Sequence, residues 1–220
     1  DIYIKKHMDG VIFAGEVDIR VIEEFRKQSI PVVLVNNYLD MDGLVCISAD
    51  HYGGAVQATE YLCKLGHCKI GLLSGRFSPQ VSEARIEGFV KTLAKYDIPV
   101  DDRFIADIEP ALEDGEEIMT RMLREVDRPT AFFCTNDTIA AGAMKAVTRA
   151  GLRVPEDIAI IGFDDSYISR VVEPELTTVR IDAAKMGCLA MQTLFDLIAG
   201  MPVEKAHIQI PTELIVRGTA

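Results

Sequence analysis

Residues 130–165 are TAFFCTNDTIAAGAMKAVTRAGLRVPEDIAIIGFDD, and this stretch decides the fold. Its first residues, Thr130 to Cys134, form a short apolar run typical of a buried strand. The next stretch, Asp137 to Ala150, is expected to be a helix capped by its first residue, and Gly151 supplies the left-handed stop. A second apolar strand follows over Ile158 to Ile161. Two strands joined by one helix form a βαβ unit with parallel strands.

The same alternation of strands and helices extends in both directions from this unit. We expect further strands at residues 10–15, 31–36, 44–48, 70–73, 104–106, 207–210 and 213–216, and helices at 17–27, 52–65, 82–96, 114–126 and 182–199. This order predicts an α/β protein with parallel sheets. No internal repeat or flexible linker is visible.

The composition limits which functions the chain can have. The 220 residues carry a net charge of −11, so we do not expect them to bind DNA by themselves, because such binding depends on clustered Lys and Arg. No apolar stretch is long enough for a membrane span, and the first residues do not resemble a secretion signal. The five cysteines are an odd number in mostly apolar surroundings, which favours reduced thiols and a cytoplasmic location.

Polar residues at the ends of the expected strands are the candidate binding residues, because ligands of open parallel sheets bind beyond the carboxyl ends of the strands. They are Ala14, Asn36, Asn37, Ser48, Ser74, Asn136, Asp137, Asp164 and Asp165, with Arg85 early in the helix after Gly75. This mixture suits a polar, uncharged or weakly anionic small molecule such as a sugar. Each main candidate also has a structural interpretation: Asp137 and Asp164 as caps of helices or turns, Asn36 as a turn former, and Arg85 as a surface ion pair with Glu83 or Glu87.

Catalytic and metal motifs are weak. The sequence lacks a nucleophile elbow, a His-Glu-x-x-His motif and a phosphate loop, so we expect no enzyme activity and no cofactor. Cys63 and His67 share a helix face near Cys68, but a fourth ligand is missing, and core packing is the better interpretation. The histidines at 7, 51 and 207 are isolated.

A series of short motifs, in order along the chain, resembles the LacI/GalR family of transcriptional regulators. The most specific are IGFDD at 161–165 and EPELTTVR at 173–180. The others are DGVI at 9–12, IPVV at 30–33, LGH at 65–67, IGLLSG at 70–75, ARIEGF at 84–89, PTAFFCTND at 129–137 and VPEDI at 154–158. The resemblance covers the chain from Asp9 to its last residue.

This resemblance implies a periplasmic-binding-protein-like fold of type I, with two doubly wound parallel-sheet lobes around an effector cleft. We expect residues 1–48 and 181–205 in the amino-terminal lobe and residues 49–180 and 206–220 in the other. Family members have a helix-turn-helix head and a first strand, helix and strand before the position of Asp1. The first lobe is therefore expected to be incomplete at its amino terminus, and the DNA-binding head to be absent.

The resemblance also implies the site and the partners. The effector-binding positions of the family correspond to Arg85, Asn136, Asp137 and Asp164, with Asn36 and Ala14 from the first lobe; many relatives have Asp where this chain has Asn36. The expected partners are a small-molecule effector, a second copy of the chain that meets apolar residues Ile168, Val171 and Val172, and operator DNA through the absent head only. The effector would shift an equilibrium between two states.

The main alternative is a periplasmic sugar-binding protein for transport, which shares this fold and cleft. Unpaired cysteines, the absence of a secretion signal and the ending ELIVR at 213–217 favour the regulator. A sugar-acting enzyme is a third alternative, and it would turn its ligand over.

Overall fold

The computed structural model describes residues 8–37, 39, 41, 43–203 and 206–220. By its internal contacts the chain divides into two units. Unit 1 comprises the chain up to Asp50 together with Asp182–Pro211, and unit 2 comprises His51–Ile181 and Thr212–Ala220. Both units are α/β, as the sequence predicts.

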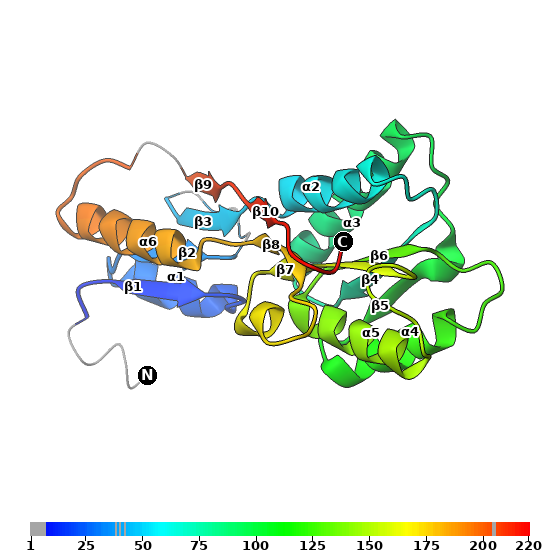
Figure 1. Ribbon diagram of the computed structural model, residues 1–220. Coiled ribbons are helices and arrows are strands. Elements are labelled where there is room, and N and C mark those ends of the chain that lie inside the picture. The colour runs from blue at the N-terminus through cyan, green and yellow to red at the C-terminus, as the bar shows by residue number, and fades with distance from the viewer. Residues whose placement is uncertain (1–7, 38, 40, 42, 204–205) are drawn as a thin grey trace. The chain divides into compact units, whose positions relative to one another are not determined.

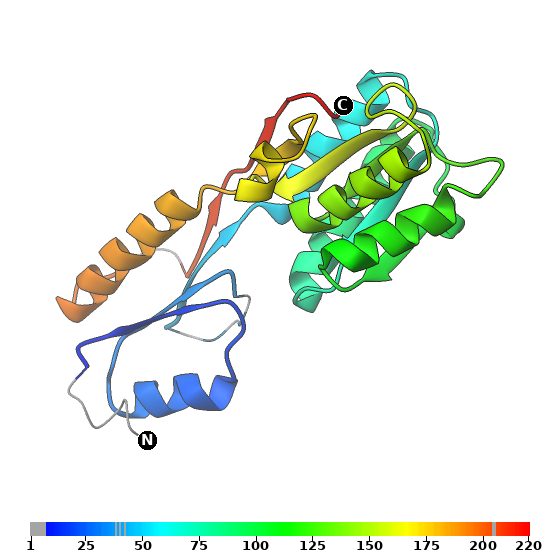
Figure 2. The same ribbon diagram turned by 60° about the horizontal axis from the view of Figure 1, so that its bottom comes forward.

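Within the described residues, unit 1 is built on a sheet with the strand order β1-β2-β3-β9 (Figure 1). Its elements are β1 (Val11–Ala14), α1 (Ile19–Lys27), β2 (Val32–Val35), β3 (Val45–Ala49), α6 (Ala183–Ile198) and β9 (His207–Ile210). All strand pairs are parallel. β3 is buried throughout, whereas β1 at one edge is only half-buried. Figure 2 shows α1 and α6 on opposite sides of this sheet.

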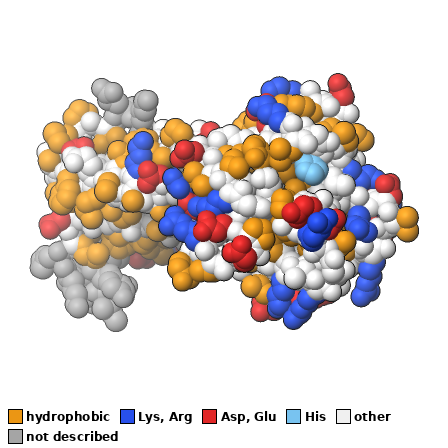
Figure 3. Space-filling model, viewed as in Figure 1, with side chains coloured by type: hydrophobic (Ala, Val, Ile, Leu, Met, Phe, Trp, Pro, Cys, Tyr) orange, Lys and Arg blue, Asp and Glu red, His pale blue; other side chains and the backbone are white. Residues whose placement is uncertain are grey.

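Helix α6 leaves part of its apolar surface uncovered. It begins after Asp182, whose side chain accepts a hydrogen bond from the amide of Lys185 at 2.8 Å. One face packs on β1, β2 and β3. Hydrophobic side chains also lie on the surface over this helix (Figure 3). Met191, Phe195 and Ile198 of α6 are 46%, 59% and 43% exposed.

Unit 2 contains a sheet with the strand order β10-β8-β7-β6-β4-β5, in which only β10 is antiparallel to its neighbour. The strands are β4 (Ile70–Gly75), β5 (Ile105–Ile108), β6 (Ala131–Cys134), β7 (Ala159–Asp164), β8 (Thr177–Arg180) and β10 (Glu213–Ile215). The helices are α2 (His51–Lys64), α3 (Pro79–Lys95), α4 (Leu112–Met122) and α5 (Asp137–Arg149), with short 3-10 helices η1 (Asp102–Phe104) and η2 (Tyr167–Arg170).

Helices cover both faces of the unit 2 sheet. Phe132 packs into the core beneath α4 and α5, and Phe133 packs with Phe89 and Phe163 beneath α2 and α3. Successive side chains of a strand point to opposite faces, so a strand covered on both faces must be apolar at every position. The run AFFC at 131–134 has this property, and the predicted doubly wound α/β fold is confirmed for this unit.

The structure corrects the predicted division of the chain at β9. This strand pairs in parallel with β3, so residues 207–210 belong to unit 1, although the sequence analysis placed residues 206–220 in the other lobe. Residues 49–50 also join unit 1, because β3 extends to Ala49. The boundary predicted at residue 205 lies outside the described residues.

Candidate functional site

Arg85 is the centre of a polar cluster at the carboxyl edge of the unit 2 sheet. It is carried by α3, which follows β4, and its side chain is 4% exposed. Its guanidinium donates to the Thr135 carbonyl, to Asp164 Oδ1 at 3.3 Å and to His51 Nδ1 at 3.2 Å. Because Arg85 is buried among these acceptors, a surface ion pair with Glu83 or Glu87 does not describe it.

Two aromatic rings flank the same guanidinium. Arg85 Cζ lies 3.9 Å from the centroid of the Phe163 ring and 4.9 Å from that of Phe77. A cation over the face of an aromatic ring is attracted by the electron density of the ring. The rings and the three acceptors together hold Arg85 in one orientation.

Asp164 remains partly accessible, as does Asn136. Asp164 ends β7 with a φ of 108°, a backbone conformation that residues other than glycine rarely adopt and that recurs at binding sites. Its Oδ1 faces Arg85, its Oδ2 accepts a hydrogen bond from Asn136 Nδ2 at 3.0 Å, and its side chain is 30% exposed. Burial raises the pKa of Asp164 above its ordinary value, although Arg85 and Asn136 oppose the rise.

Asn136 connects the start of α5 to this cluster. Its Oδ1 accepts hydrogen bonds from the amides of Thr138 at 2.7 Å and Ile139 at 3.2 Å, so Asn136 is the N-cap of α5. The prediction that Asp137 caps this helix is therefore wrong. Because Asn136 Nδ2 donates to Asp164, both ends of the amide are used.

Asp137 points into the interior of unit 2. The residue is fully buried, Oδ1 accepts a hydrogen bond from the Thr178 hydroxyl at 2.5 Å, and Oδ2 accepts one from the Ser166 amide at 2.6 Å. A Cβ atom at Gly162 would lie 2.4 Å from Asp137 Oδ1, so only glycine leaves room for the carboxylate. Burial raises the pKa of Asp137 to about 6. In this conformation the side chain has no exposed surface to offer a ligand.

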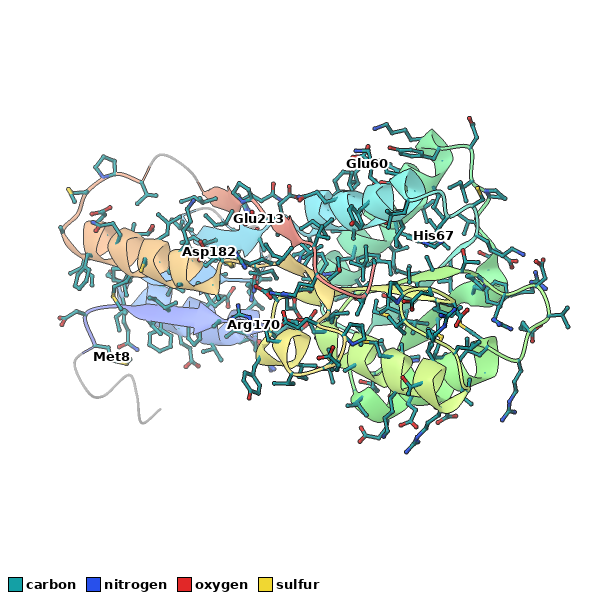
Figure 4. All side chains as sticks on the ribbon, viewed as in Figure 1. Met8, Glu60, His67, Arg170, Asp182 and Glu213 are labelled. Carbon is teal, nitrogen blue, oxygen red and sulfur yellow. The ribbon has the colours of Figure 1, made fainter. Side chains whose placement is uncertain are left out.

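Asp165, next to Asp164, has a different environment. Its side chain is 2% exposed, with Oδ1 2.5 Å from Arg217 Nη2 and Oδ2 2.8 Å from Arg180 Nε. Arg170 of η2, labelled in Figure 4, adds a third ion pair at 3.3 Å. Burial raises the pKa of Asp165, but hydrogen bonds from Arg217, Arg180 and Ser169 outweigh it and lower the pKa to about 2. Asp165 therefore joins η2, β8 and the chain end.

The candidates from unit 1 lie at the carboxyl ends of its strands. Ala14 ends β1 and is exposed. Asn36 follows β2 at a bend with a φ of 51°, and its Oδ1 accepts a hydrogen bond from the Ala49 amide at 3.4 Å. Asn37 Nδ2 donates to the Gly15 carbonyl at 2.9 Å and links the ends of β1 and β2. A role of Ala14 and Asn36 in ligand binding stays a prediction.

His51 belongs to the cluster and was missed by the sequence analysis, which treated it as isolated. It is 3% exposed, and burial, with the nearby charge of Arg85, lowers its pKa to about 3, so the ring is neutral near pH 7. Since an Arg85 N–H points at Nδ1, the ring proton is on Nε2. The sequence did offer one indication that His51 lies near the site: it begins a helix that directly follows a strand.

The cysteine and histidine group near the end of α2 has ordinary packing. His67 Nδ1 lies 2.8 Å from Thr130 Oγ1, and Cys68 is exposed with Sγ 3.5 Å from the Gly66 carbonyl. In the part of the chain that the structure describes, no group of three or more His, Cys, Asp or Glu side chains is arranged to hold a metal ion. A search of the same residues finds no helix with the length and apolarity to span a membrane.

Two α/β units and a polar cluster at the carboxyl edge of a parallel sheet define the class of protein. The family model of the periplasmic binding protein-like domain matches residues 59–220, so the chain contains a domain of this kind.

Comparison with known proteins narrows the class. The probable HTH-type transcriptional repressor ExuR of Bacillus subtilis (strain 168) is 35% identical over 211 residues, which are 95% of this chain and 63% of ExuR. The crystal structure of a LacI-family regulatory protein from Chloroflexus aggregans has a TM-score of 0.90 at 30% identity and covers 99% of this chain and 79% of that one. A LacI-family regulator from Enterococcus faecium with bound ribose has a TM-score of 0.88 at 26% identity, with 99% and 82% covered. The chain belongs to the LacI family of regulatory proteins. It spans a little under two thirds of the length of ExuR.

Proposed function

We propose that this chain is the effector-binding domain of a LacI-type transcriptional repressor and that Arg85, Asn136 and Asp164 contact the effector. The observation that carries the proposal is the hydrogen-bonded series Asn136–Asp164–Arg85 at the carboxyl edge of the unit 2 sheet. Ligands of open α/β sheets bind at this edge, and the series offers both donors and acceptors. Ala14 and Asn36 complete the proposed set, whereas Asp137 supports it from the interior.

The effector class follows from the same groups. A carboxylate, an amide and a guanidinium suit hydroxyl groups, and the related regulator from Enterococcus faecium holds ribose. A small polar metabolite, with a sugar as first candidate, is therefore proposed for this chain. No cofactor is part of this mechanism.

Contact with operator DNA is assigned to a part of the parent protein outside these residues. The relative ExuR is named an HTH-type repressor, but the 220 residues here have a net charge of −11, which disfavours contact with phosphates. A repressor acts on the chromosome, so we place the protein in the cytoplasm. The domain is proposed to work as a homodimer.

The apolar residues around η2 support the homodimer proposal in part. Val171 is 54% exposed and Tyr167 is 81% exposed, so both offer surface to a second copy. Ile168 and Val172 are half-buried, and Val172 packs against the core of unit 2. The sequence analysis expected Ile168, Val171 and Val172 to meet a second copy. We now propose that Tyr167 and Val171 form most of this apolar surface.

Effector binding and DNA binding are proposed to be thermodynamically linked. An effector that prefers one conformational state shifts the equilibrium toward that state, within the limit of its differential affinity. A hundredfold preference corresponds to about 2.7 kcal/mol, which is enough for a genetic switch.

The two alternatives differ in what they predict. A transport protein of the same fold is disfavoured because the relatives found are regulators. We propose binding without turnover, so a sugar incubated with the protein should be recovered unchanged, whereas an enzyme would convert it.

A thermal-shift screen of neutral sugars, sugar acids, sugar phosphates and purines tests the proposed function. At least one compound should raise the melting temperature, and Arg85→Ala should abolish the shift. Arg103→Ala is the matched control, because Arg103 also pairs with an aspartate, Asp101 at 2.7 Å, and packs on a phenylalanine, but before β5 at the amino edge of the sheet. An unchanged shift in Arg85→Ala would contradict the site assignment.

A further inference from the structure

We infer that Phe77 is a movable cover of the proposed site: its ring lies over Arg85 and must rotate away before an effector reaches the guanidinium. The inference rests on the proposed function, because it concerns access to the same site. It is carried by the burial of Arg85 and by the different positions of the two rings that lie against it.

The burial of Arg85 separates it from a ligand. Its side chain is 4% exposed, although it lies at the edge of the sheet where the effector is proposed to bind. An effector that contacts this guanidinium therefore needs one of its neighbours to move. The neighbour that moves most easily is the one with the fewest ties to the interior of unit 2.

Most neighbours of Arg85 are fixed in that interior. His51 is 3% exposed, and Thr135 and Phe163 have no exposed surface. Phe163 belongs to β7 and to the core beneath α2 and α3. None of these three residues leaves the guanidinium without opening closely packed structure.

Phe77 has a different position. It lies in the loop of residues 76–78 between β4 and α3, it is half-buried, and its ring centroid is 4.9 Å from Arg85 Cζ. Asp164 is also partly accessible, but hydrogen bonds join it to both Arg85 and Asn136. The Phe77 ring is held over the cation only by the weaker attraction between a ring and a charge.

The ring is able to move while the loop keeps its backbone. The amide of Arg76 donates to the Ile108 carbonyl at 2.8 Å, and the amide of Phe77 donates to Ser82 Oγ at 3.2 Å. These hydrogen bonds fix the backbone, whereas the ring turns about its side-chain bonds from one staggered conformation to another. Such rotations of partly exposed side chains are faster than loop movements.

A glycine beneath the ring permits the covering position. A Cβ atom at Gly75 would lie 2.8 Å from Phe77 Cε2 and 2.9 Å from its Cζ, closer than side-chain atoms approach one another. A larger residue at this position would push the ring away from Gly75. The fold therefore leaves a space that the Phe77 ring fills.

The cover has a consequence for binding. When only one arrangement of a site accepts a ligand, the apparent affinity falls by the fraction of molecules in that arrangement. Phe77 thus sets how often Arg85 is available, and a variant without the ring should present Arg85 permanently.

Labelling with phenylglyoxal, which reacts with accessible arginine side chains, tests the inference without any effector. Peptide mass spectrometry gives the labelling rate of Arg85 in the folded 220-residue chain. The rate should rise about fivefold or more in Phe77→Ala, and also in Gly75→Ala, which displaces the ring without removing it. Phe77→Tyr keeps a ring of the same shape and should react like the unmodified chain.

Two controls separate the cover from a general loosening of the structure. Arg103, whose side chain is 58% exposed and lies 5.2 Å from the centroid of the Phe104 ring, should react at the same rate in every variant. Phe195→Ala removes an exposed ring from α6 of unit 1 and should leave the rate at Arg85 unchanged. Urea unfolding verifies that each variant is folded.

The possible outcomes distinguish the cover from the proposed function. A rise of less than about fivefold at Arg85 in folded Phe77→Ala overturns the inference, and the proposed function stands if Arg85→Ala still abolishes the thermal shift. The expected rise together with a failed thermal-shift screen supports the cover over Arg85 and contradicts the proposed function.

Discussion

Asp164 and Asp165 are neighbours in the chain, yet they lie in opposite kinds of environment. Asp164 keeps 30% of its side chain accessible and has one arginine partner, while Asp165 keeps 2% and has three. Burial raises the pKa of the first, and the hydrogen bonds of the second outweigh its burial and lower its pKa to about 2.

The backbone separates the two side chains. Both residues have positive φ, 108° at Asp164 and 51° at Asp165, so the chain turns sharply where β7 ends. One carboxylate is directed to Arg85 and the other to Arg217. One motif, GFDD, therefore supplies the carboxylate that we propose for effector binding and a carboxylate that holds the fold together, and their partners distinguish them.

The largest expected effect is on stability, from Asp165→Asn. The substitution removes the nearer of the two carboxylates that pair with Arg217, whose side chain is 12% exposed, and leaves only Glu175 at 3.6 Å. Loss of one member of a buried ion pair costs about 3 kcal/mol of unfolding free energy. Urea unfolding at pH 7 measures this cost, and a loss below about 1 kcal/mol would remove the proposed distinction between the two aspartates.

The next largest effect is a dependence of stability on pH that comes from Asp137 and runs opposite to that of Asp165. Its pKa is about 6 in the folded chain and 3.8 ordinarily, so between these values the folded state binds more protons, and stability falls as pH rises from about 4 to 6. The fall should be about 2 to 3 kcal/mol, and Asp137→Asn should abolish it. Asp165 acts in the opposite direction: its stabilisation is present above pH 3.8 and is lost as pH falls toward 2.

Urea unfolding at pH 4.5, 5.5 and 7 measures the Asp137 contribution alone, because the Asp165 contribution changes only below pH 3.8. Asp101→Asn, with an exposed ion pair, serves as the control and should retain the slope between pH 4.5 and 6. The same slope in Asp137→Asn and the unmodified chain would show that Asp137 is not its source.

A smaller effect is expected at His51. His51→Phe keeps the ring buried beside Phe163 but removes the acceptor for Arg85, so sugar affinity should fall about tenfold, equivalent to about 1.4 kcal/mol. His51→Asn offers an oxygen to Arg85 and should restore part of the loss. Equal affinity in His51→Phe and the unmodified chain would show that Arg85 does not depend on this contact.

The smallest effect should come from Arg76→Ala. Arg76 and its partners Asp107 and Glu109 are all more than half exposed, and such pairs contribute little to stability. The urea midpoint should stay unchanged within error, and neutral sugars should bind within twofold of the unmodified chain. A large loss of sugar affinity would place Arg76 in the site beside Arg85.

Much of the fold is predictable from the sequence, because strands buried on both faces are apolar throughout. The run AFFC at 131–134 and the run AIIGF at 159–163 show this property, and the order of strands and helices follows from it. The placement of β9 was not predictable in this way, since His207–Ile210 is a short strand and its partner is decided by contacts distant in sequence.

The site was predicted in part. Arg85, Asn136 and Asp164 are joined by direct hydrogen bonds, as expected of residues at neighbouring strand ends. The cap of α5 was assigned to Asp137 instead of Asn136, because a capping pattern cannot tell which of two adjacent polar residues has the extended backbone of an N-cap. His51 was missed because its contact with Arg85 spans 34 residues.

The most direct test of the account measures binding and stability together in Asp164→Asn and Asp165→Asn. The account predicts that Asp164→Asn weakens binding of the best sugar at least tenfold. It should lower the unfolding free energy by no more than about 1 kcal/mol, because burial disfavours the charged form of Asp164, whereas the partners of Asp165 favour its charged form. Asp165→Asn should lower stability by about 3 kcal/mol, while the folded protein binds the sugar within threefold of the unmodified chain. The reverse pattern, with binding lost in Asp165→Asn and stability lost in Asp164→Asn, would contradict it.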